Sequence, residues 1–223
     1  CVGYIFDPRR TREFKWYRPQ EGRNSISHNN VKALYYDADK EIIWIGTHLG
    51  GMNRLDIRSG HFTHYRMEDN NQQTLPSDIV RDIIPYKDLL IVATQNGVCL
   101  FEPDSGKCRQ LFKDSKEGKS IKMVADILLD SEGTLWIAAT GEGVFSYRFA
   151  TGKLTNYRHD SANPNSLSNN NVNNIMQDSQ GHLWFSTSGS GLDLYHPANN
   201  DFENFDKEKN GLASDCVYET QES

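Results

Sequence analysis

The sequence has little of several features that mark common protein classes. Its four cysteines include no Cys-x-x-Cys pair, so a metal site built from four thiolates is not expected. No apolar run approaches the roughly 18 residues that a helix needs to span a bilayer. The formal net charge of −6 argues against nucleic-acid binding, which needs a basic face. Sustained helical periodicity is also missing, so we expect no helix longer than two turns.

The chain has 223 residues, of which 37% are hydrophobic, enough for a packed core. It opens at Cys1-Val2-Gly3 without a Met, and we expect it to be a piece of a longer protein.

What the sequence does contain is a repeat. Its first landmark is a short run that starts with Trp or Ile and recurs every 45 to 48 residues, at Trp44–Thr47, Ile91–Thr94, Trp136–Thr140 and Trp184–Thr187. A Gly followed by an apolar residue comes six or seven residues after each start. Glycines at such regular places suit tight turns that need a positive φ or a close backbone approach.

Two other landmarks recur with the same period. One is a run of four residues that starts and mostly ends with an apolar side chain, at Phe14–Tyr17, Phe62–Tyr65, Cys108–Leu111, Leu154–Tyr157 and Phe202–Phe205. The other is a Leu or Ile close to a Ser, at Ile26–Ser27, Leu75–Ser77, Leu167–Ser168 and Leu212–Ser214, with Ile121 in the remaining repeat. Three independent landmarks on one period indicate a repeat architecture.

Each repeat predicts four short strands. In the repeat that follows Ile121 we expect strands at Val124–Leu129, Leu135–Ala139, Val144–Arg148 and Leu154–Arg158, because these segments are rich in β-branched and aromatic residues and are separated by turn residues. Four strands in a unit of about 40 to 50 residues is the size of a β-propeller blade. The predicted fold class is therefore all-β, made of four-stranded antiparallel propeller blades.

The landmarks divide the chain into four complete blades with partial blades at both ends. The predicted complete blades span residues 26–74, 75–120, 121–166 and 167–211. Residues 1–25 hold only outer strands, and residues 212–223 hold only the first strand of another blade. We therefore expect a fragment of a larger propeller, or an arc that pairs with a second copy, because exposed edge strands invite pairing.

The repeat resembles a known family at several points. The matching segments are Asp130–Ile137, Asp178–Phe185, Phe101–Lys107 and Asn163–Ser168. In combination they resemble the two-component regulator propeller repeat, which builds the periplasmic sensor half of hybrid two-component systems in gut Bacteroidetes. The resemblance implies seven-bladed propellers that sense glycan fragments and signal across the inner membrane to a histidine kinase. It names no glycan, and its motif is structural, so it assigns no ligand residue to this chain.

The recurring Trp has two interpretations, a platform on which a sugar stacks or a side chain packed between blades. Recurrence at the same place in successive blades favours packing, since a ligand site is not needed in every blade. The Asp-Ser-x-Gly turns before Trp136 and Trp184 are similar to the Asp-box of sialidases. Their Asp-to-Trp spacing is one residue longer than in that motif, so we interpret them as β-turns with Gly in a left-handed position.

Histidines and cysteines suggest no reaction. His61 and His64 are three residues apart on a predicted strand, which places them on opposite faces and prevents chelation. We predict no metal, no cofactor and no catalytic residue. Cys99 and Cys108 flank one turn, so a cross-strand disulfide is open, as is a role for Cys108 as a small buried apolar side chain.

A ligand site is predicted at one end of the blades. In an antiparallel blade, the loop before the first strand and the loop between the second and third strands lie at the same end. These loops carry amides and hydroxyls that suit sugar hydroxyls, and their side chains vary between repeats. The candidate ligand residues are Asn30, His48, Gln95, Asn96, Glu142, Asn170 and Ser188. The alternative is that Asn and Ser only cap turns here.

Ligand sensing by a periplasmic region, with an oligosaccharide as partner, is the function that these patterns favour. The alternatives are an interaction scaffold that binds another protein or itself, and a glycan-acting lyase or sialidase-like enzyme. The enzyme would need perturbed acid–base groups that converge in one pocket. We expect other blades of the parent protein as partners, and neither nucleic acid nor membrane contact by this region.

Overall fold

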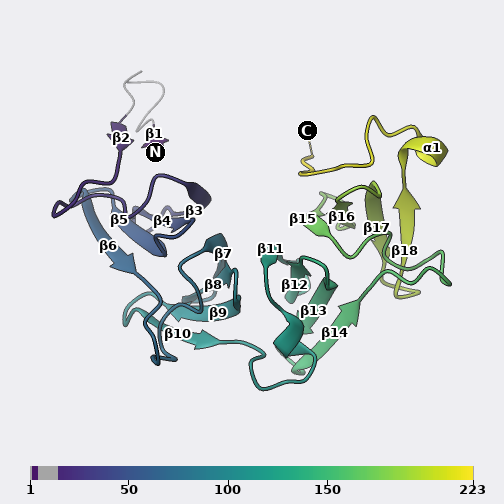
Figure 1. Ribbon diagram of the computed structural model, residues 1–223, viewed down its shortest axis with the longest axis horizontal. Helices are drawn as coiled ribbons and strands as arrows, with labels where there is room; N and C mark the ends of the chain where they lie inside the picture. The colour runs from purple at the N-terminus through teal and green to yellow at the C-terminus, as the bar shows by residue number, and fades with distance from the viewer. Residues whose placement is uncertain (1, 5–14, 223) are drawn as a thin grey trace. The chain divides into compact units, whose positions relative to one another are not determined.

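The computed structural model describes residues 2–4 and 15–222. It confirms the all-β prediction, with four sheets that each contain four consecutive antiparallel strands (Figure 1). Blade 1 holds β3 (Val31–Asp37), β4 (Ile42–Thr47), β5 (Met52–Asp56) and β6 (His61–Tyr65). Blade 2 holds β7 (Val80–Tyr86), β8 (Leu89–Thr94), β9 (Gly97–Glu102) and β10 (Lys107–Gln110).

The other two blades follow the same plan. Blade 3 holds β11 (Val124–Leu129), β12 (Thr134–Ala139), β13 (Gly143–Arg148) and β14 (Lys153–Tyr157), each within one residue of its predicted bounds. Blade 4 holds β15 (Val172–Gln177), β16 (Leu183–Thr187), β17 (Leu192–His196) and β18 (Asp201–Phe205). A short pair, β1 (Val2–Tyr4) and β2 (Lys15–Tyr17), precedes blade 1. The described helices are single turns, η1 (Gly118–Ser120) and α1 (Lys207–Asn210).

The chain forms two compact units, residues 1–110 with blades 1 and 2 and residues 111–223 with blades 3 and 4. In every blade the first strand carries a bulge at its start, such as that between Val31 and Ala33. A bulge adds one residue to one strand and re-aims the side chains that follow. The four blades therefore share their irregularities as well as their strands.

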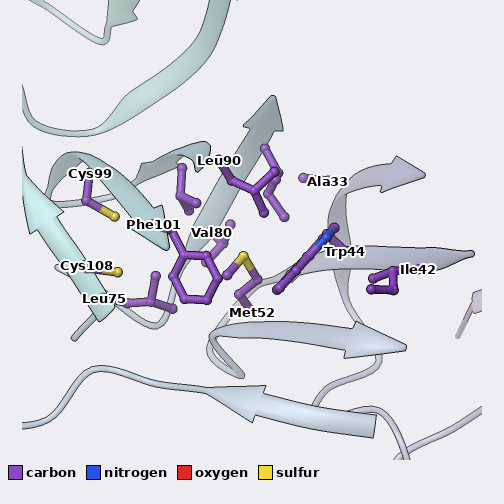
Figure 2. Packing of buried hydrophobic residues seen from close by; sticks show 12 residues of the cluster. Ala33, Ile42, Trp44, Met52, Leu75, Val80, Leu90, Cys99, Phe101 and Cys108 are labelled. Atoms are coloured by element: carbon purple, nitrogen blue, oxygen red, sulfur yellow. The ribbon is translucent and has the colours of Figure 1, made fainter. Parts of the chain in front are cut away.

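The recurring Trp packs one blade on the next. In the first unit Trp44 is 1% exposed, and its ring lies 5.4 Å from that of Phe101 on β9 of blade 2 (Figure 2). In the second unit Trp136 is 3% exposed and lies 5.5 Å from Phe185 and 5.0 Å from Tyr195, both in blade 4. The packing interpretation is thus confirmed for both Trp residues. Trp184 is only partly buried and lies 5.7 Å from Phe205 of its own blade.

The Asp-Ser-x-Gly turns do more than reverse the chain. Gly133 and Gly181 have φ values of 78° and 87°, as the turn interpretation predicts. Asp130 accepts hydrogen bonds from the backbone N–H of Thr134 at 2.8 Å and from the indole N–H of Trp136 at 2.8 Å. The turn therefore fixes the orientation of the packed indole, because one carboxylate holds both.

The second of these turns shows the electrostatic consequence. The indole N–H of Trp184 donates to Asp178 at 2.9 Å, and this bond, with others from His182 and Gln180, lowers the pKa of Asp178 to about 2. Burial opposes the shift but is outweighed, since hydrogen bonds to a carboxylate favour its charged form.

The Ser of each Asp-Ser-x-Gly turn makes a hydrogen bond to the repeat that follows. The backbone N–H of Ser131 donates to the side-chain oxygen of Gln177 in blade 4 at 2.9 Å. Ser179 makes the equivalent bond to Glu222 at 2.7 Å. Nearer the start of the first strand, Asp126 accepts the backbone N–H of Ile175 at 2.7 Å. A polar bond thus flanks the apolar packing at each end of the first strand.

Residues 212–222 follow blade 4 without forming a strand. They hold one isolated bridge, between Cys216 and Ser188. Yet Val217 donates its N–H to the carbonyl of Thr187 at 3.1 Å, and Thr220 donates to Asn174 at 3.1 Å, as Ile175 does to Asp126. This segment therefore makes the contacts that a first strand makes with the preceding blade, but it holds an isolated bridge in place of a continuous ladder of backbone hydrogen bonds.

Cys99 and Cys108 are free thiols in the core of the first unit. They lie on neighbouring strands (Figure 2), but Cys99 is paired with Gln110 and Cys108 with Phe101, so they are diagonal neighbours. Hydrogen bonding to Cys108, together with burial, raises the pKa of the Cys99 thiol. The structure therefore places Cys108 as a small buried side chain.

Replacing Asp130 by Ala tests the role of the turn. The substitution removes the acceptor of the Trp136 indole and of two backbone N–H groups, so we expect a loss of about 1–3 kcal/mol in the free energy of unfolding. Urea denaturation followed by Trp fluorescence measures it. The control is Glu132→Ala, two residues further along the same turn. The Glu132 side chain is exposed, and the interaction that it would lose is an exposed ion pair with Arg148. Equal losses in the two variants would contradict this role.

Candidate functional site

The predicted ligand residues of the first unit lie where two kinds of loop meet. We call the segment before each first strand the leading loop and the segment between the second and third strands the tip loop. The tip-loop residue His48 donates its N–H to the carbonyl of Asn30 at 2.8 Å and is bridged to Ile79. Gln95 donates its N–H to the carbonyl of Ile79 at 3.0 Å. Asn30, His48 and Gln95 therefore lie along one connected path.

The side chains on this path are partly accessible to solvent. His48 and Gln95 are partly buried, and Asn30 and Asn96 are exposed. The Nδ1 atom of His48 is buried and has no hydrogen-bond partner among the described residues. Asn96 donates weakly to the carbonyl of Pro76 at 3.4 Å, and its own carbonyl accepts from Gln110 at 3.1 Å.

In the second unit the same loops meet, with one change to the predicted set. Thr140 donates its N–H to the carbonyl of Met123 at 3.2 Å, and Ser188 donates to that of Asn171 at 2.9 Å. By these bonds Thr140, rather than Glu142, is the equivalent of His48, Gln95 and Ser188. The sequence does contain a signal for this equivalence, because each of these four residues comes four positions after the Trp or Ile that starts the first landmark. Glu142 instead lies one residue before Gly143, as Asn96 lies before Gly97.

Asn170 has a structural task. Its side-chain oxygen accepts the N–H of His159 at 2.8 Å, and its carbonyl accepts those of Gly141 and Gly143 at 3.1 and 3.0 Å. Asp78 does the same in the first unit for Met67 and Gly51. Turn capping, the alternative weighed for these loops, therefore accounts for the contacts of Asn170.

Glu142 and Ser188 also have partners. Glu142 forms an ion pair with Arg158, and both side chains are well exposed. The hydroxyl of Ser188 donates to the side-chain oxygen of Asn173 at 2.9 Å. The structure thus places Glu142, Asn170 and Ser188 at one end of blades 3 and 4.

A polar cleft in blade 4 was not predicted. It has a volume of about 340 Å³ and lies between the leading loop, the tip loop and the segment after β18. The lining residues that matter below are His159, Asp160, Ser166, Ser168, Asn204 and Asp215. A smaller cleft of about 170 Å³ lies at the matching place in blade 2, against residues 67–76, Asn96 and Gln110. Long, Asn-rich leading loops were the sequence signal for both.

Behind the cleft of blade 4 lies a buried carboxylate. Asp193, on β17, accepts from the N–H and the hydroxyl of Ser168 at 2.9 and 3.0 Å, and from the amide of Asn204 at 2.7 Å. Its side chain is fully buried. Burial raises the pKa of Asp193 to about 6, although these hydrogen bonds and the nearby His159 oppose the shift.

Two other kinds of feature, a metal site and a membrane-spanning helix, are absent from the described residues. No group of His, Cys, Asp or Glu among residues 2–4 and 15–222 is arranged to hold a metal ion. Within the same residues no helix is long and apolar enough to cross a membrane. His61 is exposed, and the His64 ring nitrogen Nε2 lies 2.8 Å from the carbonyl of Ser25.

Two of the solved structures similar to this chain are extracellular domains. One, from a Bacteroides thetaiotaomicron protein classed as a hybrid two-component system, is 21% identical with a TM-score of 0.73, and the match covers 85% of this chain and 26% of that one. A second such domain from the same organism is 18% identical with a TM-score of 0.66, and the match covers 92% of this chain and 26% of that one. Identities this low establish the propeller fold alone.

A third similar structure has a different setting. PorZ, a surface component of the type-IX secretion system of Porphyromonas gingivalis, is 17% identical with a TM-score of 0.67, and the match covers 91% of this chain and 31% of PorZ. This chain therefore spans about a quarter to a third of the length of the structures it matches. No curated protein matches the chain.

The family comparison identifies the repeat. Residues 25–48 and 166–189 match the two component regulator propeller. Each matched segment runs from the leading loop of a blade to its tip loop, and so includes the first two strands, in blade 1 and in blade 4. The chain therefore carries repeats of the two-component regulator propeller family, as the resemblance in its sequence predicted.

Proposed function

We propose that this chain is part of the ligand-sensing region of a two-component sensor, located in the periplasm, and that it recognises glycan fragments. Family membership of the repeats and the extracellular setting of similar domains support this role. The parent protein would pass the signal to a histidine kinase elsewhere in its sequence. The repeat family is one of regulators and not of enzymes, which favours sensing over the lyase or sialidase alternative.

One observation carries the location of the proposed site. His48, Gln95, Thr140 and Ser188 make the same backbone bond to a leading loop, yet their side chains are an imidazole, an amide and two hydroxyls. A loop with only a structural task has little reason to vary in this way. Imidazole, amide and hydroxyl groups offer both donors and acceptors, which is what sugar hydroxyls require.

A protein-docking role is the second candidate. Leu49 in a tip loop and Met67 and Met123 in leading loops are 55%, 45% and 52% exposed. Exposed apolar side chains on loops at the same end of their blades suit a protein partner more than a sugar, because burial of apolar surface drives most protein association.

Binding of glycans tests the first candidate. Purified chain would be titrated calorimetrically with sized oligosaccharides from plant, host and microbial polysaccharides. We expect His48→Ala and Gln95→Ala, both in the first unit, each to weaken binding of the active oligosaccharide by about tenfold, the cost of one lost hydrogen bond of roughly 1.4 kcal/mol. Thr140→Ala tests the tip loop of blade 3 in the second unit separately. Glu142→Ala belongs in the same series, since Glu142 was predicted from the sequence.

The control for this experiment lies at the other end of the blades. Asp39→Ala, Asp104→Ala and Glu132→Ala change exposed turns between first and second or third and fourth strands. They should leave the affinity unchanged. Equal affinity in all tip-loop variants, with the fold intact by circular dichroism, would remove these loops as the ligand site. Leu49→Ser with unchanged glycan binding but lost capture of a protein partner would favour the second candidate.

Stability separates structural residues from ligand residues at this site. Asn170→Ala removes the acceptor of the His159 N–H, so we expect a loss of about 1–2 kcal/mol in the free energy of unfolding. Glu142→Ala removes only an exposed ion pair, and we expect a change below about 0.5 kcal/mol. Urea denaturation measures both. A larger loss for Glu142→Ala than for Asn170→Ala would reverse the assignment.

A further inference from the structure

Two blades hold their leading loop by the same pair of positions. In blade 1, Asn53 on β5 accepts the N–H of Ser27 at 2.8 Å, and the His64 ring contacts the carbonyl of Ser25 at 2.8 Å. In blade 4, Asp193 accepts the N–H of Ser168 at 2.9 Å, and Asn204 donates to the carbonyl of Ser166 at 3.1 Å. We call this arrangement the latch.

The positions are equivalent by register. Asn53 is paired with His64, and Asp193 with Asn204, as neighbours on the third and fourth strands. Blade 3 has Phe145 paired with Asn156 in these places and no acceptor for a leading loop. The Oδ1 atom of Asn156 is buried there without a hydrogen-bond partner. The latch therefore depends on a polar residue in the third strand.

The two latches differ at both positions: His64 in blade 1 is replaced by Asn204 in blade 4, and Asn53 by Asp193. Asn53 does its task with a neutral amide, and its side chain is fully buried. Asp193 is equally buried but can carry a charge. Since an amide suffices in blade 1, the carboxylate in blade 4 brings a property beyond anchorage, namely a reversible proton.

We propose that Asp193 makes the latch of blade 4 sensitive to protons, so that the leading loop, residues 159–168, is held more tightly when this carboxyl is protonated. The neutral carboxyl keeps the observed contacts. A proton on Oδ2 can be donated to the Ser168 hydroxyl, which serves as donor or acceptor, while Oδ1 still accepts from Asn204. The neutral latch thus holds its bonds without a desolvated charge.

The direction of the effect follows from linkage. Burial holds the pKa of Asp193 at about 6, above its ordinary 3.8, so the closed latch binds a proton more readily than the open, hydrated one. The stabilising proton is fully present below the ordinary pKa and is lost as the pH rises through about 6. When the loop opens at neutral pH the carboxylate becomes hydrated, and the opening equilibrium therefore increases with pH up to this point.

Other charged groups face the same cleft and must be separated from Asp193. His159 is one of them: its Nδ1 lies 2.9 Å from the carbonyl of Leu167, and its charge lowers the pKa of Asp193. On the neighbouring β18 the partner is the uncharged Asn204. The remaining charged residues that line the cleft are Asp160, Asp206, Glu208, Lys209 and Asp215.

Hydrogen exchange of the whole 223-residue chain tests the proposal. Peptides that cover residues 159–171 and 18–30 would be followed by mass spectrometry from pH 4.5 to 7.5, with rates divided by the intrinsic exchange rates. We expect the protection of 159–171 to fall by about 20-fold between pH 4.5 and 7.0 and to level off above, the factor that the two pKa values imply. Protection of 18–30, latched by Asn53, should stay constant in a His64→Asn chain, in which both side chains of the latch are amides.

Three variants make the test specific. Asp193→Asn should keep 159–171 protected at every pH, because the amide copies the neutral acid. In the His64→Asn chain, Asn53→Asp should give residues 18–30 a pH response. His159→Gln should retain the response of 159–171, since Asp193 and not His159 is the switch. A flat profile in the native chain, an unchanged response in Asp193→Asn, or loss of the response in His159→Gln would each overturn the proposal.

Discussion

The structure depends on one contact, the packing of a second-strand aromatic ring against the second and third strands of the following blade. No blade has enough residues to bury both of its faces alone, so each must share a core with a neighbour. Trp44 against Phe101, and Trp136 against Phe185 and Tyr195, supply that shared core within each unit. Polar bonds at the ends of the first strands fix how blade 4 is oriented against blade 3, which apolar packing alone does not specify. These bonds join Ser131 to Gln177 and Asp126 to Ile175.

Two carboxylates of blade 4 show how the same side chain acquires opposite properties. Asp178 lies in an exposed turn, accepts hydrogen bonds from the chain around it and has its pKa lowered to about 2. Asp193 also accepts hydrogen bonds, but burial outweighs them and raises its pKa to about 6. The difference is desolvation, since both carry comparable numbers of donors. Asp178 therefore serves as a permanent anion that orients an indole, whereas Asp193 can change charge near neutral pH.

Much of the fold could be predicted because apolar residues and glycines recur at regular positions in every repeat. The four strands of blade 3 were located to within one residue, and Gly133 and Gly181 have the left-handed φ that their turns required. The tie from Asp130 to the Trp136 indole could not be predicted, because sequence spacing does not show which side chain a turn carboxylate reaches. Thr140 differs in this respect, because it follows Trp136 by four positions, as His48 follows Trp44, so the spacing of the repeat was enough to place it although Glu142 was predicted instead.

Constant backbone bonds with variable side chains describe the tip loops as a whole. The N–H groups of His48, Gln95, Thr140 and Ser188 satisfy leading-loop carbonyls, so the loops keep their shape whatever the side chain. Side chains at these positions can therefore change without loss of the fold. The latch likewise combines a constant structural task with a side chain that differs between blades. Asn53 and Asp193 perform one structural task, and the choice between amide and acid is free to set a response to pH without cost to the geometry of the loop.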